Sequence, residues 1–155
     1  MTPNNLFKGA VAAHRSRPVI VTGFPFPDTA FVRELTVKDG RFAVTDREHA
    51  CLLDELGTVC LSPDTLTLLG FTDVPGCRKA EFCDGGKEDV PARVLTLRDE
   101  RVRAVYPSLN DRQSCHVLVL DAADGSFKAS AVISDILSLQ KLVSLSDDTP
   151  LIPLP

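Results

Sequence analysis

Three features that mark familiar protein classes are missing from this 155-residue sequence. No run approaches the ~20 apolar residues that a membrane-spanning helix requires, and residues 1–13 hold no apolar segment long enough for a secretory signal. The phosphate-binding pattern G-x-x-x-x-G-K followed by Ser or Thr is also absent. We therefore expect an intracellular protein, cytoplasmic or nuclear, that has no membrane partner and no ATPase engine.

An excess of positive charge is missing as well. The chain carries 17 Lys and Arg against 21 Asp and Glu, which gives a net charge of -4. Nucleic-acid binding draws on clustered Lys and Arg that neutralise phosphates. The basic group of Arg98, Arg101 and Arg103 is interrupted by Asp99 and Glu100, which is typical of a solvated face. We expect no nucleic-acid partner. An adaptor that associates with nucleic acid is the third of three functional hypotheses, after a non-catalytic protein-binding module and a small hydrolase or transferase.

The cysteines lack the spacing of a disulfide framework or a zinc site. Zinc sites pair cysteines about two to four residues apart, whereas Cys77 and Cys83 are farther apart and no second pair accompanies them. An odd number of cysteines at irregular spacing favours reduced intracellular thiols. We expect no metal and no cofactor. The five are Cys51, Cys60, Cys77, Cys83 and Cys115.

A catalytic thiol is the main chemical alternative. Nucleophilic catalysis needs a thiolate or hydroxyl beside a base that a third group orients. Cys77 and Cys83 are the candidate nucleophiles, and His49 and His116 are the candidate bases. A small Cys/His-dependent hydrolase or transferase is therefore the second alternative. A thiol, an imidazole and a carboxylate in one pocket would favour it over a non-catalytic protein.

The beginning of the chain is patterned as strands. Residues 1–17 show no clear period, so we expect a loosely ordered start. Pro18 to Phe24 is a continuous apolar run, typical of a strand covered on both faces, and Thr29 to Lys38 alternates at period two. Asp39-Gly40 predicts a tight hairpin turn, because glycine takes positive φ at low cost, and residues 41–44 then form the returning strand.

Two short helices are predicted near the middle of the chain. Thr45 and Glu48 have the spacing of a capping box, which predicts a helix that ends at Leu56, although an extended segment also fits there. A second helix over 62–69 begins with a Ser-Pro-Asp cap. It ends at Gly70, which can take the left-handed conformation.

The remaining segments alternate between strands and turns. We expect strands over 58–61, 92–97, 102–106, 115–121 and 127–133, with a loop that carries Pro75-Gly76 and Gly85-Gly86 between the first two. Ser134 or Asp135 caps a C-terminal amphipathic helix. This predicts an α+β, mostly β fold with a mixed or antiparallel sheet or barrel-like core and two or three short helices. It forms one globular domain over 18–146, with a potential subdivision near 57 and a proline-rich tail over 147–155.

The centre of the chain, residues 58–97, resembles one half of a double-psi β-barrel. The segments VCLSPDTLTLLGF, PGC and GGKEDVPARVLTL are similar to the barrels in the N-terminal substrate- and cofactor-binding domains of AAA ATPases of the Cdc48 type. Cys77 stands where that family often has Asp. The resemblance implies recognition of a substrate or adaptor protein. The matching positions are Leu61, Ser62, Pro63, Leu66, Leu69, Gly70, Gly76 and Val94.

The sequence as a whole predicts a non-catalytic protein-interaction module that binds another protein, with its oligomeric state left open. Segments that carry Phe-Pro or Leu-Ile-Pro can dock in extended form into a partner's groove. The candidate binding residues are therefore Phe24, Phe26, Leu151 and Ile152. The competing interpretation is that these segments cover the edge of their own domain.

Overall fold

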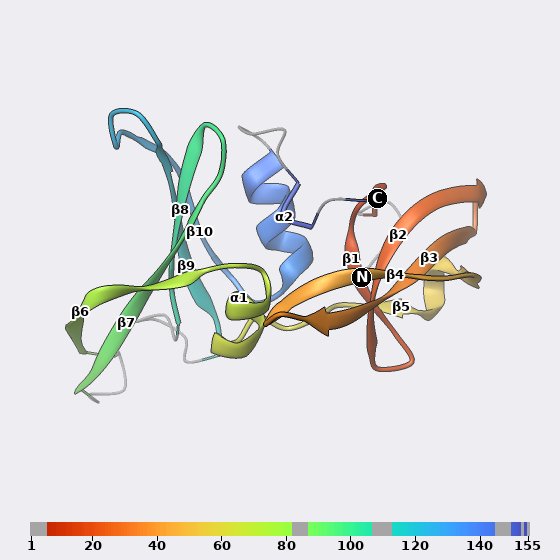
Figure 1. Ribbon diagram of the computed structural model, residues 1–155, viewed down its shortest axis with the longest axis horizontal. Coiled ribbons are helices and arrows are strands. Elements are labelled where there is room, and N and C mark those ends of the chain that lie inside the picture. The colour runs from red at the N-terminus through yellow and green to blue at the C-terminus, as the bar shows by residue number, and fades with distance from the viewer. Residues whose placement is uncertain (1–5, 82–86, 107–112, 145–149, 153, 155) are drawn as a thin grey trace.

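The computed structural model describes residues 6–81, 87–106, 113–144, 150–152 and 154 (Figure 1). These residues form two antiparallel sheets and two α-helices, so the mostly β, α+β fold is confirmed. Sheet one has the order β4-β3-β2-β1-β5, with β1 Val11–His14, β2 Arg17–Phe26, β3 Thr29–Lys38, β4 Arg41–Leu52 and β5 Leu56–Gly57. Sheet two has the order β10-β9-β8-β7-β6, with β6 Thr72–Glu81, β7 Lys87–Thr96, β8 Glu100–Val105, β9 Cys115–Asp121 and β10 Phe127–Ile133. The helical segments are η2 Leu53–Glu55, α1 Pro63–Leu68 and α2 Ile136–Ser144.

Two hairpin turns in sheet one use left-handed backbone. Asp39 and Gly40 join β3 to β4 with φ of 54° and 75°, as predicted. Arg15 and Ser16 join β1 to β2 with φ of 51° and 65°. A turn of this kind usually carries glycine, asparagine or aspartate, so sheet one presents an arginine at a position where hairpins rarely have one.

The helix predicted from Thr45 to Leu56 is wrong. The strand β4 continues to Leu52, and only the 3₁₀ segment η2 then turns the chain. The Thr45 hydroxyl donates a 2.8 Å hydrogen bond to the Glu34 carbonyl and caps no helix. A helix of about three turns is marginal by itself, so pairing along the whole of β3 outweighs the local signal.

The prediction that residues 1–17 are loosely ordered is wrong for the second half of this segment. The strand β1 lies inside sheet one between β2 and β5, and Ala10, Val11 and Ala12 are fully buried. Residues 1–5 lie outside the described part of the chain.

In the middle of the chain, one predicted element is confirmed and two predictions are wrong. The Ser62 hydroxyl accepts the Thr65 backbone N–H at 3.2 Å and caps α1, as the sequence predicted. The strand predicted over 58–61 is wrong, because only Cys60 makes an isolated bridge there. The loop predicted around Pro75-Gly76 is wrong as well. Those residues lie in β6, where a register shift against β7 absorbs them as a bulge.

The C-terminal third matches the prediction closely. The strands β9 and β10 begin and end where the alternation places them, and Val117 and Val119 turn one face of β9 into the core. Asp135 accepts the Ser138 backbone N–H at 2.7 Å and caps α2. The predicted loop residues Gly85-Gly86 lie outside the described part of the chain.

The larger apolar cluster joins both sheets. Figure 1 shows α2 between the two sheets, and its Leu139 packs in a cluster with Val11 and Ile20 of sheet one and Val102 and Val117 of sheet two. A smaller cluster gathers inward-facing side chains from every strand of sheet one and from η2, so sheet one curls around it. Its buried members are Ala10, Ala12, Val19, Val21, Ala30, Val32, Cys51, Leu53, Leu56 and Leu137.

The tail residues Leu151 and Ile152 belong to the larger cluster and are only 7% and 4% exposed. They therefore cover their own domain, and the structure corrects the expectation that they form an exposed docking segment. No helix among the described residues is long and apolar enough to span a membrane.

Candidate functional site

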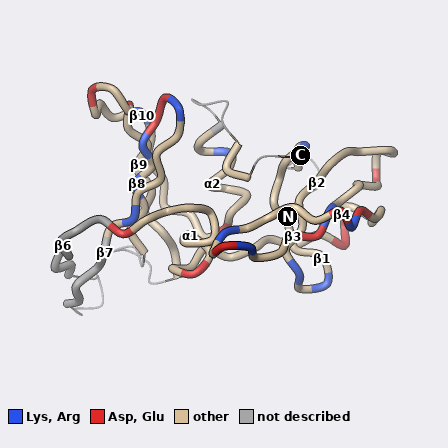
Figure 2. Tube along the Cα trace, viewed as in Figure 1, with Lys and Arg blue, Asp and Glu red and all other residues tan. Residues whose placement is uncertain are grey.

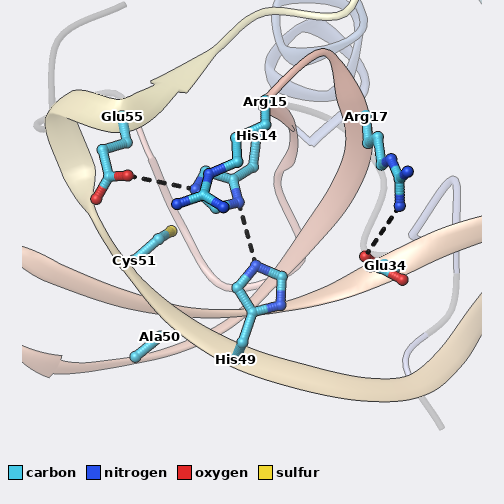
Figure 3. Close-up of a pocket in the computed structure, with 8 residues that line it drawn as sticks. All are labelled: His14, Arg15, Arg17, Glu34, His49, Ala50, Cys51 and Glu55. Carbon is cyan, nitrogen blue, oxygen red and sulfur yellow. Dashed lines mark hydrogen bonds and ion pairs between the residues drawn. The ribbon is translucent and has the colours of Figure 1, made fainter.

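A polar pocket opens at one end of the curled sheet one. The register pairs His14 with Arg17, Val19 with Glu34 and Val32 with His49, and cross-strand partners share a face of the sheet. The inward face of sheet one is apolar along most of its length, but at the end that holds the pocket it carries charged and polar side chains. The cavity has a volume of about 610 Å³, within the usual range for small-ligand sites. This histidine pocket is lined by His14, Arg15, Arg17, Glu34, His49, Ala50, Cys51 and Glu55 (Figure 3).

Two imidazoles meet inside the histidine pocket. The distance from His49 Nε2 to His14 Nδ1 is 3.1 Å, and the ring centroids are 5.1 Å apart. Such a bond requires that one nitrogen carries a proton and that the other offers a lone pair. The bonded pair can thus hold at most one proton between the two facing nitrogens.

Glu55 lies on the far side of His14. One carboxylate oxygen, Oε1, accepts the Leu52 backbone N–H at 3.0 Å, while Oε2 lies 3.5 Å from His14 Nε2. The backbone hydrogen bond from Leu52, followed by the contact with His14, holds the pKa of Glu55 below its usual range. Glu55 is therefore a carboxylate at neutral pH. The contact with His14 is long for a hydrogen bond, and the buried Nε2 makes no hydrogen bond within the described part of the chain.

Cys51 lies on the same inward face, two residues after His49. Its side chain is buried, and burial followed by the charge of Glu55 raises the pKa of the Cys51 thiol. A nucleophilic cysteine needs the opposite shift, because the thiolate is the reactive form. The pocket thus brings together a thiol, imidazoles and a carboxylate, but it keeps the thiol protonated.

Two arginines, Arg15 and Arg17, and two glutamates, Glu34 and Glu55, line the pocket, so their fixed charges balance. Arg17 Nη1 lies 3.8 Å from one Glu34 carboxylate oxygen, and Arg47 Nη1 lies 3.6 Å from the other. Arg15 makes no hydrogen bond or ion pair with any described residue. Its charge helps to lower the pKa of Glu55 from a distance. Both carboxylates of the pocket therefore have partners, and Arg15 is left over.

Only one of the predicted catalytic residues lies in this pocket. His49 lines it, whereas His116 is on β9 and Cys77 is on β6, both in sheet two. The side chain of Cys77 and the whole of Cys83 lie outside the described part of the chain. Within that part, no group of three or more His, Cys, Asp or Glu side chains is placed to hold a metal ion. The sequence prediction missed His14, Cys51 and Glu55.

A second surface feature lies on the outer face of sheet one. Phe31 faces outward and pairs with Gly23 and Ala50, while Leu52 pairs with Thr29 in the next row. Because Gly23 has no side chain, it does not cover the neighbouring Phe31 ring. Even a Cβ added at Gly23 would lie 3.8 Å from that ring. The outer apolar patch consists of Phe26, Phe31 and Leu52, which the register places in adjacent rows and which are 66%, 38% and 45% exposed. Phe24, on the same strand as Phe26, is 43% exposed.

Thiol reactivity should follow these environments. We expect iodoacetamide at neutral pH to label the exposed Cys60 at least about tenfold faster than Cys51 or Cys115, because burial raises the pKa of both buried thiols and brings that of Cys115 to about 11. Timed quenching and peptide mass spectrometry measure the three rates in one sample. Faster labelling of Cys51 than of Cys60 would instead indicate an activated thiol in the histidine pocket.

Similarity to known proteins adds no assignment for either the histidine pocket or the outer apolar patch. Their roles have to follow from their own geometry and charge. No protein-family model, curated protein or solved structure matches the chain.

Proposed function

We propose that this chain is a non-catalytic protein-interaction module that binds an extended peptide segment of a partner protein. The observation that supports this function is the outer apolar patch. Three large apolar side chains exposed in adjacent rows of neighbouring strands are more than the scattered single residues of an ordinary surface, and such patches mark interaction sites. Phe26, one of the binding candidates from the sequence, belongs to this patch, and Phe24, another candidate, is exposed on the same strand.

The edge strand β4 supports an extended partner. Sheet one begins with β4, and no described strand pairs with its outer side. Its first residue, Arg41, donates a hydrogen bond to the Leu69 carbonyl at the end of α1, and residues 42–45 are half-buried. Residues 46–48, in contrast, are exposed. A peptide added along the second half of β4 would gain main-chain hydrogen bonds. Its alternate side chains would reach Phe31 and Leu52 on the outer face.

The hydrolase or transferase alternative has weaker support. The required groups converge in the histidine pocket, but the raised pKa of the Cys51 thiol opposes nucleophilic attack. An association with an AAA ATPase, which the resemblance of residues 58–97 implies, is the more specific form of the proposal. Its partner would be a substrate or adaptor protein.

Selection from a random peptide-display library, with the full chain immobilised, tests the proposal. We expect the selected peptides to carry apolar residues at alternate positions. In fluorescence polarisation, a synthetic selected peptide should bind the Phe26→Asp and Phe31→Asp variants at least about tenfold more weakly than the wild type, because each substitution puts a charge into the apolar contact.

Phe127→Asp is the matched control. Phe127 is 64% exposed, close to the 66% of Phe26, but it lies on β10 of sheet two. This variant should bind the peptide as the wild type does. The proposal would be rejected by a library that yields no binder above background. Selected peptides that bind all three variants equally well would reject it too.

A further inference from the structure

The histidine pocket combines an opening in the curled sheet, an arginine with no direct contact among the described residues and a pair of imidazoles. The protein-interaction function uses none of these. We infer that the histidine pocket binds a small doubly charged oxyanion, of the phosphate or dicarboxylate class, and takes up a proton when it does so. Arg15 and Arg17 supply fixed charge, and the His14–His49 pair supplies donors that an anion can recruit.

The arginine that has no direct contact among the described residues favours an anion in the pocket. In Figure 2 the turn between β1 and β2 carries Lys or Arg positions, coloured blue, at one end of sheet one. The Glu34 carboxylate is shared by Arg17 and Arg47, and Glu55 is held by a backbone N–H and faces His14. Arg15 is the cation without a described partner, and guanidinium groups bind oxyanions with charge-assisted hydrogen bonds.

The turn fixes where Arg15 presents its charge. Arg15 and Ser16 both have positive φ in a two-residue hairpin turn, which leaves the backbone little freedom. In Figure 3 the side chains of His14 and Arg15 enter the pocket from the turn, and His49 approaches them from β4. An anion placed between them would meet a guanidinium and an imidazole from opposite walls.

Proton uptake follows from the imidazole pair. The 3.1 Å bond between His14 and His49 leaves only one proton between the facing nitrogens. A second proton would place two N–H groups face to face, so the pair would open and offer both as donors to an anion. Imidazole is the side chain whose charge normally changes between about pH 5 and 8. Anion binding and protonation therefore favour each other.

The other groups around the pair keep their charge in this pH range. Arg15 and Arg17 stay cationic. Glu55, with its lowered pKa, stays a carboxylate, and Cys51, with its raised pKa, stays a neutral thiol. Glu34, on β3, stays in contact with two arginines. The imidazole pair is thus the group that couples protons to the anion.

Isothermal titration calorimetry of the full chain with sodium sulfate tests the inference, with sodium oxalate as the planar counterpart. Both anions keep their charge across the range, so any pH dependence comes from the protein. A step that takes up one proton changes its affinity by up to about tenfold per pH unit. We expect at least one of the two anions to bind about tenfold more tightly at about pH 6 than at about pH 8. The measured heat should vary with the ionisation enthalpy of the buffer.

Three variants separate this site from general charge attraction. Arg15→Gln should weaken binding by about tenfold at both pH values, and His49→Gln should abolish the pH dependence. Arg98→Gln removes an exposed charge from the turn between β7 and β8 of sheet two and should change nothing, with far-UV circular dichroism confirming that each variant is folded. Failure of both anions to bind, equal affinity at the two pH values, or equal effects of Arg15→Gln and Arg98→Gln would each overturn the inference.

Discussion

Leu139→Ala should lower the free energy of unfolding by about 2–5 kcal/mol, the range for removing a fully buried leucine side chain. Leu139 has no exposed surface and packs in the cluster that contains Val11 of sheet one and Val117 of sheet two. The helix α2 lies between the sheets (Figure 1), so the cavity would open where neither sheet can close over it alone. Urea unfolding followed by far-UV circular dichroism gives the free-energy difference.

The matched control is Leu139→Met, which keeps the side-chain volume and should cost less than about 1.5 kcal/mol. Both variants should unfold in a single transition, because one apolar cluster holds residues of both sheets. Two separate transitions, with only one of them shifted by Leu139→Ala, would show that the sheets fold as independent units. A loss below about 1 kcal/mol would show that the site collapses without a cavity.

Local patterns in the sequence were sufficient where neighbouring residues decide the structure. The alternation in β9 and β10, the Asp39-Gly40 turn and the Ser62 cap are all signals within a few residues, and each was predicted correctly. The capping-box spacing of Thr45 and Glu48 is an equally local signal, but it lost to pairing with β3. Local rules could not include that partner strand.

The incorrect helix prediction from Thr45 to Leu56 also prevented a prediction of the histidine pocket. His49 and Cys51 share a face only if the segment is a strand, because residues two apart do not face each other on a helix. His14 belonged to a segment expected to be loosely ordered, and Glu55 reaches the pocket only through the turn η2. A strand assignment for residues 41–52 would have aligned His49 with Cys51. The pairing with His14 depends on how sheet one curls.

Among the four candidate binding residues, the sequence predicted exposure correctly for Phe24 and Phe26 but not for Leu151 and Ile152. Phe24 and Phe26 alternate with Pro25 and Pro27 just before Asp28, which indicates the end of a strand, and both are exposed. Leu151 and Ile152 have a similar composition but are buried against the larger cluster. Composition alone does not distinguish a segment that docks on a partner from one that docks on its own chain. That distinction depends on which apolar surface the fold leaves open.

Gln140→Leu should cost about 2–4 kcal/mol, although it places an apolar side chain at a site that is only 7% exposed. The Gln140 amide ties α2 to the start of β1. Its Oε1 accepts the Val11 backbone N–H and its Nε2 donates to the Gly9 carbonyl, each at 2.8 Å. Leucine can do neither, so the fully buried Val11 N–H would lose its partner. Amide exchange by NMR should show faster exchange at Val11.

Gln140→Glu separates the two hydrogen bonds of this amide. Its carboxylate can still accept the Val11 N–H, but it places a negative charge against the Gly9 carbonyl. That contact raises the pKa of the new carboxyl group in the folded state, and the protonated form can donate to Gly9 again. The stabilising contribution is therefore present at low pH and lost as the pH rises, so the deficit relative to wild type should shrink between about pH 7 and about pH 4. A deficit that stays constant with pH would show that the bond to Gly9 contributes little, and that the bond to Val11 alone holds α2 against β1.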